Sequence, residues 1–170
     1  MAMAEALAYK GEDVLIIFDD LTKHANVYRE IALSIGKSPG REAYPTDIFY
    51  EHSSLLERAG KFDSSRKNGS ITALPIVETV QGDIASIIPS NIISITDGQI
   101  FTNTEQFNNG NYPAIDIPLS VSRTGSSVQS PRIKEASKTL KADYAKLSEI
   151  KKFSEMAIEV TPELDKKIEQ

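Results

Sequence analysis

The chain carries one unbroken run of large apolar residues, Val14-Leu15-Ile16-Ile17-Phe18. Most of these residues are β-branched or aromatic, so the run predicts a β-strand. No polar residue alternates with the apolar ones, a pattern typical of a strand buried on both faces in a parallel sheet. Asp19 and Asp20 follow directly. They place two carboxylates at the carboxyl edge of the predicted sheet, where open α/β folds bind their ligands.

The rest of the pattern predicts an α/β region followed by an all-helical region. Apolar residues recur every three or four positions from Thr22 to Ile35 and from Ile133 to Phe153, as in amphipathic helices. Ser130-Pro131 supplies a helix cap and a first-turn proline, and Pro75 indicates an irregular or edge strand. The other expected elements are helices at 3–9, at 46–59 and from Thr161-Pro162, and strands at 70–78, 92–95, 99–102 and 114–118.

Charge and composition exclude several classes of protein. The net charge is −5 and the basic residues are scattered, which argues against nucleic-acid binding. The sequence has no cysteine, so disulfides and thiolate metal sites are excluded. It has neither the basic-then-apolar order of a signal peptide nor an apolar run of the roughly 20 residues that a membrane span needs. We therefore expect any contact with a membrane to come through partner subunits.

An apolar strand that ends in aspartate resembles a Walker B element, whose carboxylate acts on Mg²⁺ through water. By itself this signal is weak, because such strands often simply start a turn. A phosphate-binding G-x-x-x-x-G-K-[ST] loop is missing; Gly36-Lys37-Ser38 is a partial match, but a helix precedes it and a proline follows. His24 and His52 have no spacing that suggests a metal site, and we expect surface or interface packing for each. The serines 120, 122, 126 and 127 lack a G-x-S-x-G elbow, which leaves a hydrolase triad unsupported.

Several longer stretches, read together, resemble the alpha subunit of F-type rotary ATP synthases. The stretches that carry the resemblance are Val14-Leu15-Ile16-Ile17-Phe18-Asp19-Asp20-Leu21-Thr22-Lys23, Pro39-Gly40-Arg41-Glu42-Ala43-Tyr44-Pro45, Leu55-Leu56-Glu57-Arg58-Ala59, Gly69-Ser70-Ile71-Thr72-Ala73-Leu74-Pro75-Ile76-Val77-Glu78-Thr79, Ile93-Ser94-Ile95-Thr96-Asp97-Gly98-Gln99-Ile100-Phe101 and Leu119-Ser120-Val121-Ser122-Arg123. Their order and spacing match the family from about residue 2 to 155. Vacuolar-type non-catalytic subunits share part of the pattern, but the sequence from Thr96 to Phe101 favours the alpha subunit.

The resemblance implies a RecA-like P-loop NTPase domain with a mainly parallel sheet, followed by a short all-helical segment. Residues 1–129 would be the C-terminal half of the nucleotide-binding domain, without the Walker A loop. Residues 130–170 would begin the helical domain. Family members form a hetero-hexameric ring with catalytic beta subunits around a central-stalk gamma subunit. The ring couples to proton translocation from a peripheral position on the cytoplasmic face of the membrane, in a bacterium.

The resemblance also assigns roles to single residues. Arg123 falls on the arginine finger that alpha supplies in trans to the catalytic site of the neighbouring beta subunit, and Ser94 and Val121 line that interface. Asp19 falls on the Walker B carboxylate that acts on Mg²⁺, through water, at the non-catalytic site. The intact complex uses Mg²⁺ with ATP or ADP, and this chain alone, with an incomplete site, is not expected to be active.

Phe107 and Pro113 fall near the adenine of the non-catalytic site. Tyr112 stands where the family usually has arginine, which weakens the expectation of normal adenine binding. Two other interpretations stay open: a non-catalytic scaffold or interaction protein that kept the fold, or a truncated remnant of a rotary-ATPase-like subunit. The absent phosphate loop fits both of them.

Overall fold

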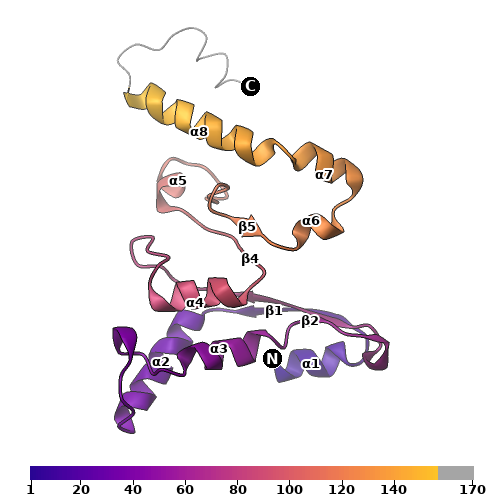
Figure 1. The fold of residues 1–170 in the computed structure, drawn as a ribbon, viewed down its shortest axis with the longest axis vertical. Coiled ribbons are helices and arrows are strands. Elements are labelled where there is room, and N and C mark those ends of the chain that lie inside the picture. Colours follow the sequence, from indigo (N-terminus) through magenta and orange to yellow (C-terminus); the bar gives the residue numbers. More distant parts are fainter. Residues whose placement is uncertain (157–170) are drawn as a thin grey trace. The chain divides into compact units, whose positions relative to one another are not determined.

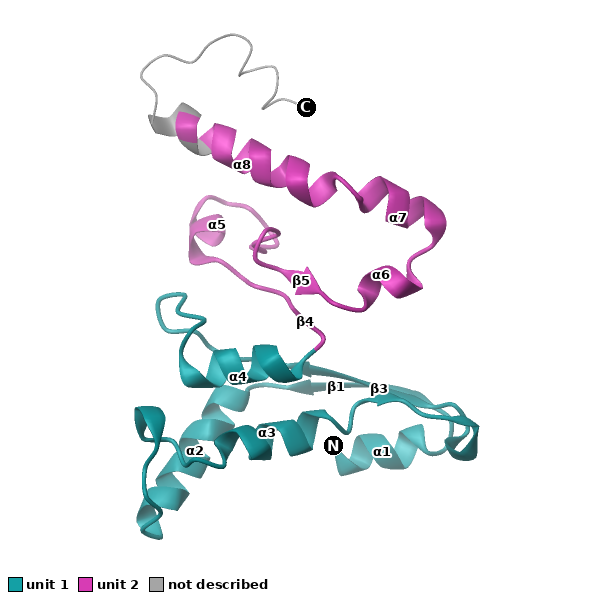
Figure 2. Ribbon diagram, in the orientation of Figure 1, with its two compact units in different colours: residues 1–96 teal, residues 97–170 magenta. Residues whose placement is uncertain are grey.

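The structure is a computed structural model that describes residues 1–156. It divides into two compact units, Met1–Thr96 and Asp97–Gln170, which Figure 2 shows in separate colours. Each unit is described by itself. The domain boundary predicted near residue 130 follows from the family resemblance and stays a prediction.

The first unit places helices beside a small β-sheet (Figure 1). In chain order its elements are α1 (Ala2–Ala8), β1 (Asp13–Phe18), α2 (Leu21–Ser34), the 3₁₀ helix Arg41–Ala43, α3 (Ile48–Leu56), β2 (Gly60–Lys61), the 3₁₀ helix Ser64–Arg66, β3 (Ser70–Pro75) and α4 (Ile87–Ile95). The predicted helices at 3–9, 22–35 and 46–59 and the strands at 14–18 and 70–78 are confirmed. Their ends differ by a few residues.

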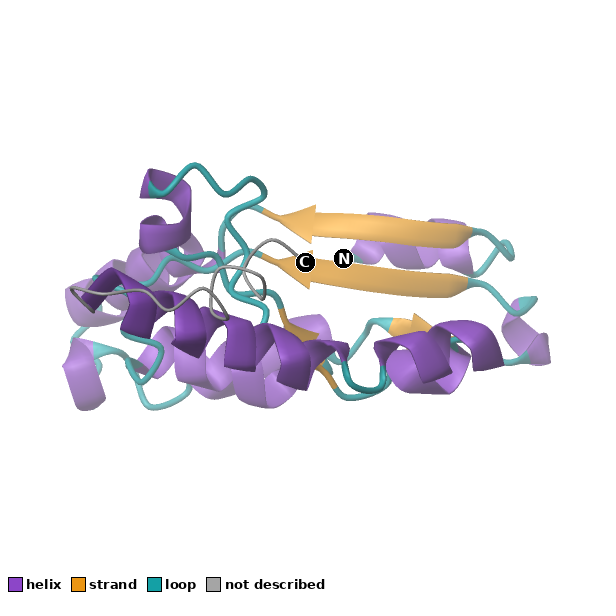
Figure 3. Cartoon of the chain, turned by 90° about the horizontal axis from the view of Figure 1, so that it is seen from above, coloured by secondary structure: helices purple, strands orange, loops and turns teal. Residues whose placement is uncertain are grey.

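The sheet has the strand order β1-β3-β2. Strands β1 and β3 run side by side in the same direction (Figure 3), with Asp13 opposite Ser70 and Phe18 opposite Pro75. Strand β2 is antiparallel and pairs only with the first two residues of β3. The α/β class is therefore confirmed, whereas the described sheets are small and mixed, so a RecA-like, mainly parallel sheet stays a prediction.

Pro75 is compatible with the central strand because of where it lies. It is the last residue of β3, beyond the part that β2 covers. On the side of β1, the hydrogen bond is donated by the next residue, from the Ile76 N–H to the Phe18 carbonyl at 2.9 Å. Because proline has no N–H, it is tolerated at a position where the neighbouring strand needs no hydrogen-bond donor. The expectation of an edge strand is wrong for the described sheet, where β3 is central and accommodates Pro75 at its end.

The prediction that β1 is buried on both faces is wrong for the described residues. Val14 and Ile16 pack into a cluster with Ala4, Ala8 and Ile71, which joins α1 to the sheet. The alternate residues Leu15 and Ile17 remain 60% and 56% exposed. Side chains alternate between the faces of a strand, and within residues 1–96 the second face of this strand stays open.

Helix α4 replaces the strand predicted at 92–95. Ile88 and Ile92 are one turn apart on the helix and both are buried in the core of the unit. Pro89 lies in the first turn, where its missing N–H has no partner in a helix anyway. The β-branched residues favour a strand only weakly, and packing of one helical face against the core decides otherwise.

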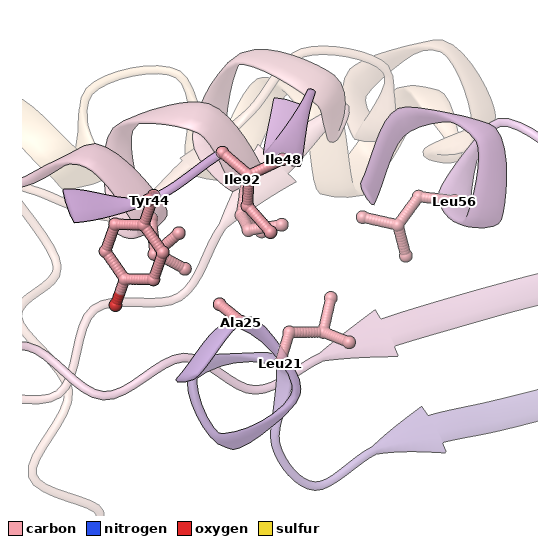
Figure 4. Close-up of a cluster of buried hydrophobic side chains, with 7 residues drawn as sticks. Leu21, Ala25, Tyr44, Ile48, Leu56 and Ile92 are labelled. Atoms are coloured by element: carbon pink, nitrogen blue, oxygen red, sulfur yellow. The ribbon is translucent and has the colours of Figure 1, made fainter. Parts of the chain in front are cut away.

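The core of the first unit lies between α2, α3 and α4. Figure 4 shows Leu21 and Ala25 of α2 facing side chains from the other elements. Its buried members are Leu21, Ala25, Tyr44, Ile48, Leu56, Ile88 and Ile92. Because each helix contributes one apolar stripe, the core holds the helices that follow β1 in fixed positions.

His52 corrects the expectation of a surface or interface histidine. Its side chain on α3 is fully buried, and its Nε2 lies 3.2 Å from Nδ1 of the exposed His24 on α2. Among the described residues, no hydrogen-bond partner reaches Nδ1 of His52. Burial, with a smaller contribution from His24, lowers the pKa of His52 from 6.5 to about 4. His52 is thus neutral in the folded chain at physiological pH.

Acid is expected to destabilise the first unit through His52. Between pH 6.5 and about pH 4, the unfolded chain binds a proton at this residue that the folded chain does not. The free energy of unfolding therefore falls as the pH drops through this window, by at most about 1.4 kcal/mol per pH unit. Urea unfolding followed by circular dichroism, at several values of pH across the window, measures the slope.

Two variants separate His52 from other acid-sensitive groups. His52→Gln should remove most of the slope, because no titrating group then remains at the buried position. His24→Gln should keep most of it, since the burial of His52 is the larger cause of the lowered pKa. An unchanged slope in His52→Gln would show that another group is responsible.

The second unit contains a two-stranded sheet, three short helices and one long helix, α8, within the described residues. Its described elements are β4 (Gly98–Gln99), α5 (Thr104–Asn108), β5 (Val121–Ser122), α6 (Gly125–Val128), α7 (Pro131–Ser137) and α8 (Leu140–Met156). Strands β4 and β5 are antiparallel, and Thr102 forms an isolated bridge with Ile115. The strands predicted at 99–102 and 114–118 are thus reduced to short pairings.

The helical region predicted from Ser130 is confirmed, but as two helices. The Ser130 side chain accepts a hydrogen bond from the Ile133 N–H, and Pro131 is the first residue of α7. The helix predicted from Thr161-Pro162 lies outside the described residues. Within residues 1–156, no helix is both long and apolar enough to cross a membrane.

Candidate functional site

The two aspartates that follow β1 occupy different environments. Asp19 is exposed, whereas Asp20 is only 8% exposed. The Asp20 carboxylate accepts hydrogen bonds from the Lys23 backbone N–H at 2.7 Å and from its Nζ at 2.8 Å. The bond from the Lys23 backbone N–H makes Asp20 the N-cap of α2. The hydrogen bonds from Lys23 hold the pKa of the Asp20 carboxyl below its usual value.

We expect Asp20→Ala to destabilise the chain by about 0.5–2 kcal/mol, the usual effect of losing a helix N-cap. Asp19→Ala should change the free energy of unfolding by less than about 0.5 kcal/mol, as for most exposed positions. Thermal or urea unfolding of the two variants measures the difference. Equal losses would mean that Asp19 also supports the fold, which would weaken its assignment to a ligand.

The ends of β1 and β3 are tied to the start of α2. The Leu21 N–H donates to the Ile76 carbonyl, and the Glu78 N–H donates to Thr22 Oγ1, both at 2.9 Å. Lys23 Nζ lies 3.6 Å from a Glu78 carboxylate oxygen as well. The parallel strands therefore deliver two exposed carboxylates to this edge, Asp19 and Glu78, of which Glu78 lies near Lys23.

This edge fits an indirect contact with a divalent cation. Mg²⁺ prefers oxygen ligands and keeps several waters, so a single exposed carboxylate such as Asp19 can hold one of those waters. Asp20 is less suited to that role, because it is buried and each of its oxygens accepts a hydrogen bond from Lys23. Within the described residues, no group of three or more histidine, aspartate or glutamate side chains could hold a metal ion.

Gly36-Lys37-Ser38 is a helix C-cap and not a phosphate-binding loop. Gly36 has a positive φ of 77° directly after α2. The Lys37 N–H donates to the Ala32 carbonyl and the Gly36 N–H donates to the Leu33 carbonyl, the pattern of a Schellman motif. Lys37 Nζ lies 3.0 Å from Asp47. The structure thus supports the rejection of this partial match.

Arg123 follows β5 in the second unit. The strand pairs Val121 with Gln99 and Ser122 with Gly98. The Arg123 N–H then donates to the Asp97 carbonyl at 2.8 Å, and its side chain lies in an exposed position. Gly98 is required for this close approach, because a Cβ there would lie 2.5 Å from the Val121 carbonyl oxygen. The backbone that carries Arg123 is therefore held by the β4–β5 pairing and by the hydrogen bond to Asp97.

The other residues predicted at the same interface lie in both units. Val121 is 43% exposed and lines an open cavity of about 310 Å³ beside β5, together with Ile100 and Ile117. Ser94 belongs to α4 in the first unit, where it is exposed and its Oγ donates to the Asn91 carbonyl at 2.7 Å. Each residue is accessible in its own unit, and their common interface stays a prediction.

The residues predicted near an adenine lie on and after α5. Phe107 and Tyr112 form an edge-to-face pair with ring centroids 5.3 Å apart and an interplanar angle of 89°. Their side chains are 55% and 69% exposed, and Pro113 is also exposed. The structure therefore brings the rings of Tyr112 and Phe107 into contact, and their role near an adenine stays a prediction.

Sequence reasoning did not find three features of these sites. The contact between His24 and His52 joins residues 28 positions apart, and no sequence spacing indicates it. The capping role of Asp20 had a signal in its spacing from Lys23, three residues on. Ser120 and Ser122 both form hydrogen bonds within the second unit, and their spacing of two residues, which places them on one face of a strand, was a signal for this.

Comparisons with known proteins agree on one family. The model of the ATP synthase alpha/beta family, nucleotide-binding domain, matches residues 1–122. The chain is 54% identical to ATP synthase subunit alpha of Mycoplasmopsis agalactiae over 91% of its length and 29% of that protein's. It is 53% identical to the same subunit of Mesomycoplasma hyopneumoniae, over 95% and 32%, and 49% identical to that of Macrococcus caseolyticus, over 100% and 34%. The chain spans about a third of the length of these curated relatives.

Proposed function

Since the chain belongs to the ATP synthase alpha/beta family, we propose that it acts as part of a non-catalytic, alpha-type subunit of an F-type proton-translocating ATP synthase. In this role it contributes an arginine to a catalytic site on a neighbouring subunit. The proposal is supported by the relatives named ATP synthase subunit alpha, which match most of the chain.

The observation that carries the proposal is the placement of Arg123. Its backbone is fixed by the β4–β5 pairing and by Asp97, while the residue itself is exposed. A guanidinium in a fixed position can neutralise the charge that develops on a phosphoryl group during transfer. It does so better than an ammonium, because its planar fork can bind two oxygens together. This is the chemistry of an arginine finger.

Arg123 would act in trans, on a nucleotide bound by a neighbouring subunit, as the family resemblance implies. The exposed Val121 and the cavity beside β5 offer an apolar surface next to the arginine. A neighbouring beta-type subunit that covers this surface would place its nucleotide within reach of Arg123. Ser94 would line the same interface.

Asp19 would act on Mg²⁺ through water at the non-catalytic site of the alpha-type subunit. Bound Mg²⁺ would neutralise phosphate charge on ATP or ADP there. Tyr112 contacts Phe107 and stands where the family usually has arginine, so we expect weaker adenine binding than Phe107 and Pro113 alone would give. The chain supplies only part of this site.

The expected assembly is a hetero-hexameric ring with beta-type subunits around a gamma-type stalk. Contact with a membrane would come through partner subunits, which fits a peripheral complex on the cytoplasmic face in a bacterium. The test is to place this segment in an intact alpha subunit and assemble it with beta subunits. Restored ATP turnover supports the proposal, and a complex that assembles without turnover contradicts it.

A non-catalytic scaffold is a second candidate, which the contact of Tyr112 with Phe107 favours. In either case we expect this chain alone to show no micromolar affinity for Mg-ATP, because no phosphate-binding backbone is present. Isothermal titration with Mg-ATP and with Mg²⁺ alone measures this. Micromolar binding that depends on Asp19 would show that the chain holds a complete site.

A further inference from the structure

Two serine hydroxyls, those of Ser120 and Ser122, fix the strand and the turn that carry Arg123. Ser120 precedes β5, and its Oγ donates to the Asp116 carbonyl at 2.6 Å and accepts from the Phe101 N–H at 3.0 Å. Its carbonyl accepts from Lys141 Nζ at 2.8 Å. Ser120 thus ties the entry of the strand to three separate segments of the second unit.

Ser122 fixes the exit of the same strand. Its Oγ accepts the Gly125 N–H at 2.9 Å, a bond that spans Arg123 and Thr124. A Cβ on Gly125 would lie 2.5 Å from this oxygen, so the turn fits closely around the hydroxyl. The Arg123 N–H is held by the Asp97 carbonyl at 2.8 Å. The backbone of Arg123 therefore has a defined position with few alternatives.

Along β5, successive side chains serve different purposes: the serines make bonds within the unit, and Val121 faces solvent. Side chains at 120 and 122 point to one face, and that at 121 points to the other. The serines use their face for bonds within the unit, while Val121 is left 43% exposed. Both hydroxyls make hydrogen bonds within the unit, and neither serine lies in the pattern of a hydrolase.

We propose that Ser120 and Ser122 are positioning residues that hold Arg123 for its action on the neighbouring nucleotide. The proposal rests on the proposed function of Arg123. Phosphoryl transfer is sensitive to small displacements of the groups that contact it, and a displacement of about 1 Å can lower the rate about a hundredfold. The hydroxyl of Ser122 matters most, because its bond closes the turn that contains Arg123.

The test uses an intact alpha subunit that carries this segment, assembled with beta subunits. Ser122→Ala should lower kcat about tenfold and leave the KM for ATP unchanged, because the lost contact affects the transition state and not substrate binding. Ser122→Thr keeps the hydroxyl and should retain most of the activity. Ser127→Ala, at an exposed serine of α6, should behave as the parent.

Two further measurements separate positioning from general loss of structure. If Ser122 acts through Arg123, Ser122→Ala should have no added effect in an Arg123→Ala background, as a double-mutant cycle would show. In this chain, the Arg123 amide should exchange its hydrogen faster in Ser122→Ala than in Ser127→Ala, because the turn that holds it is loosened.

The outcomes distinguish the two proposals. Parent-like kcat in Ser122→Ala, together with an inactive Arg123→Ala, would overturn the positioning role and leave the arginine finger intact. Parent-like kcat in Arg123→Ala would overturn both. A lower kcat in Ser122→Ala that Ser122→Thr restores, with no added effect in the double variant, supports the positioning role.

Discussion

Arg123→Ala is expected to lower ATP turnover of the assembled complex by about three to five orders of magnitude, the range found for arginine fingers in related phosphoryl-transfer systems. The guanidinium stabilises charge that develops only in the transition state, so kcat should fall while assembly survives. Because the Arg123 position is exposed, the truncation should change the stability of the fold little. Steady-state ATP hydrolysis and size-exclusion chromatography measure the two properties.

Two variants serve as controls for this prediction. Arg123→Lys keeps the charge but loses the planar, two-pronged donor, and should recover only a small part of the activity. Arg132→Ala removes an exposed arginine from α7 and should keep parent activity. Normal turnover in Arg123→Ala would refute the arginine finger, and a complex that fails to assemble would point to a structural role.

Ile48→Ala is expected to lower the free energy of unfolding of the first unit by about 2–5 kcal/mol. Ile48 is 2% exposed at the centre of the core between α2, α3 and α4 (Figure 4). Its truncation removes packing contacts and leaves a cavity that neighbouring helices can fill only in part. Urea unfolding at a pH above 6.5, where His52 is neutral in both states, measures the loss.

Matched variants separate cavity formation from other effects. Ile48→Val removes one methyl group and should cost about 0.5–1.5 kcal/mol. Ile31→Ala is a control on α2, because Ile31 is 55% exposed and its loss should matter little. If Ile48→Ala and Ile31→Ala were equally stable, the core would have a different centre.

The sequence predicts those parts of the fold that depend on local pattern. The helix at 22–35 and the strand at 14–18 are found within a residue or two, because periodicity and caps lie within the elements themselves. The strand expected at 92–95 is helical, because Ile88 and Ile92 contact a core built from distant residues. No window of sequence contains that information.

For the candidate site too, the sequence indicates some features and only the structure shows others. Asp19 and Arg123 could be found from motifs, and each lies in an exposed position at the end of a strand. The separation of Asp19 from Asp20 could not be found, because it depends on which carboxylate meets Lys23. The contact between Tyr112 and Phe107 depends on the turn that joins them. Motifs propose roles for residues, whereas the contacts of those residues follow from the folded backbone.

During synthesis, β1 leaves the ribosome well before β3, with which it pairs along its whole length. Contacts between residues so far apart in the sequence form slowly, since the intervening chain must first be brought together. Helices α2 and α3 lie in that interval and can form locally. Until β3 is synthesised, Val14 to Phe18 can pair with other nascent chains, so the yield of folded protein should depend on how quickly translation passes residue 75.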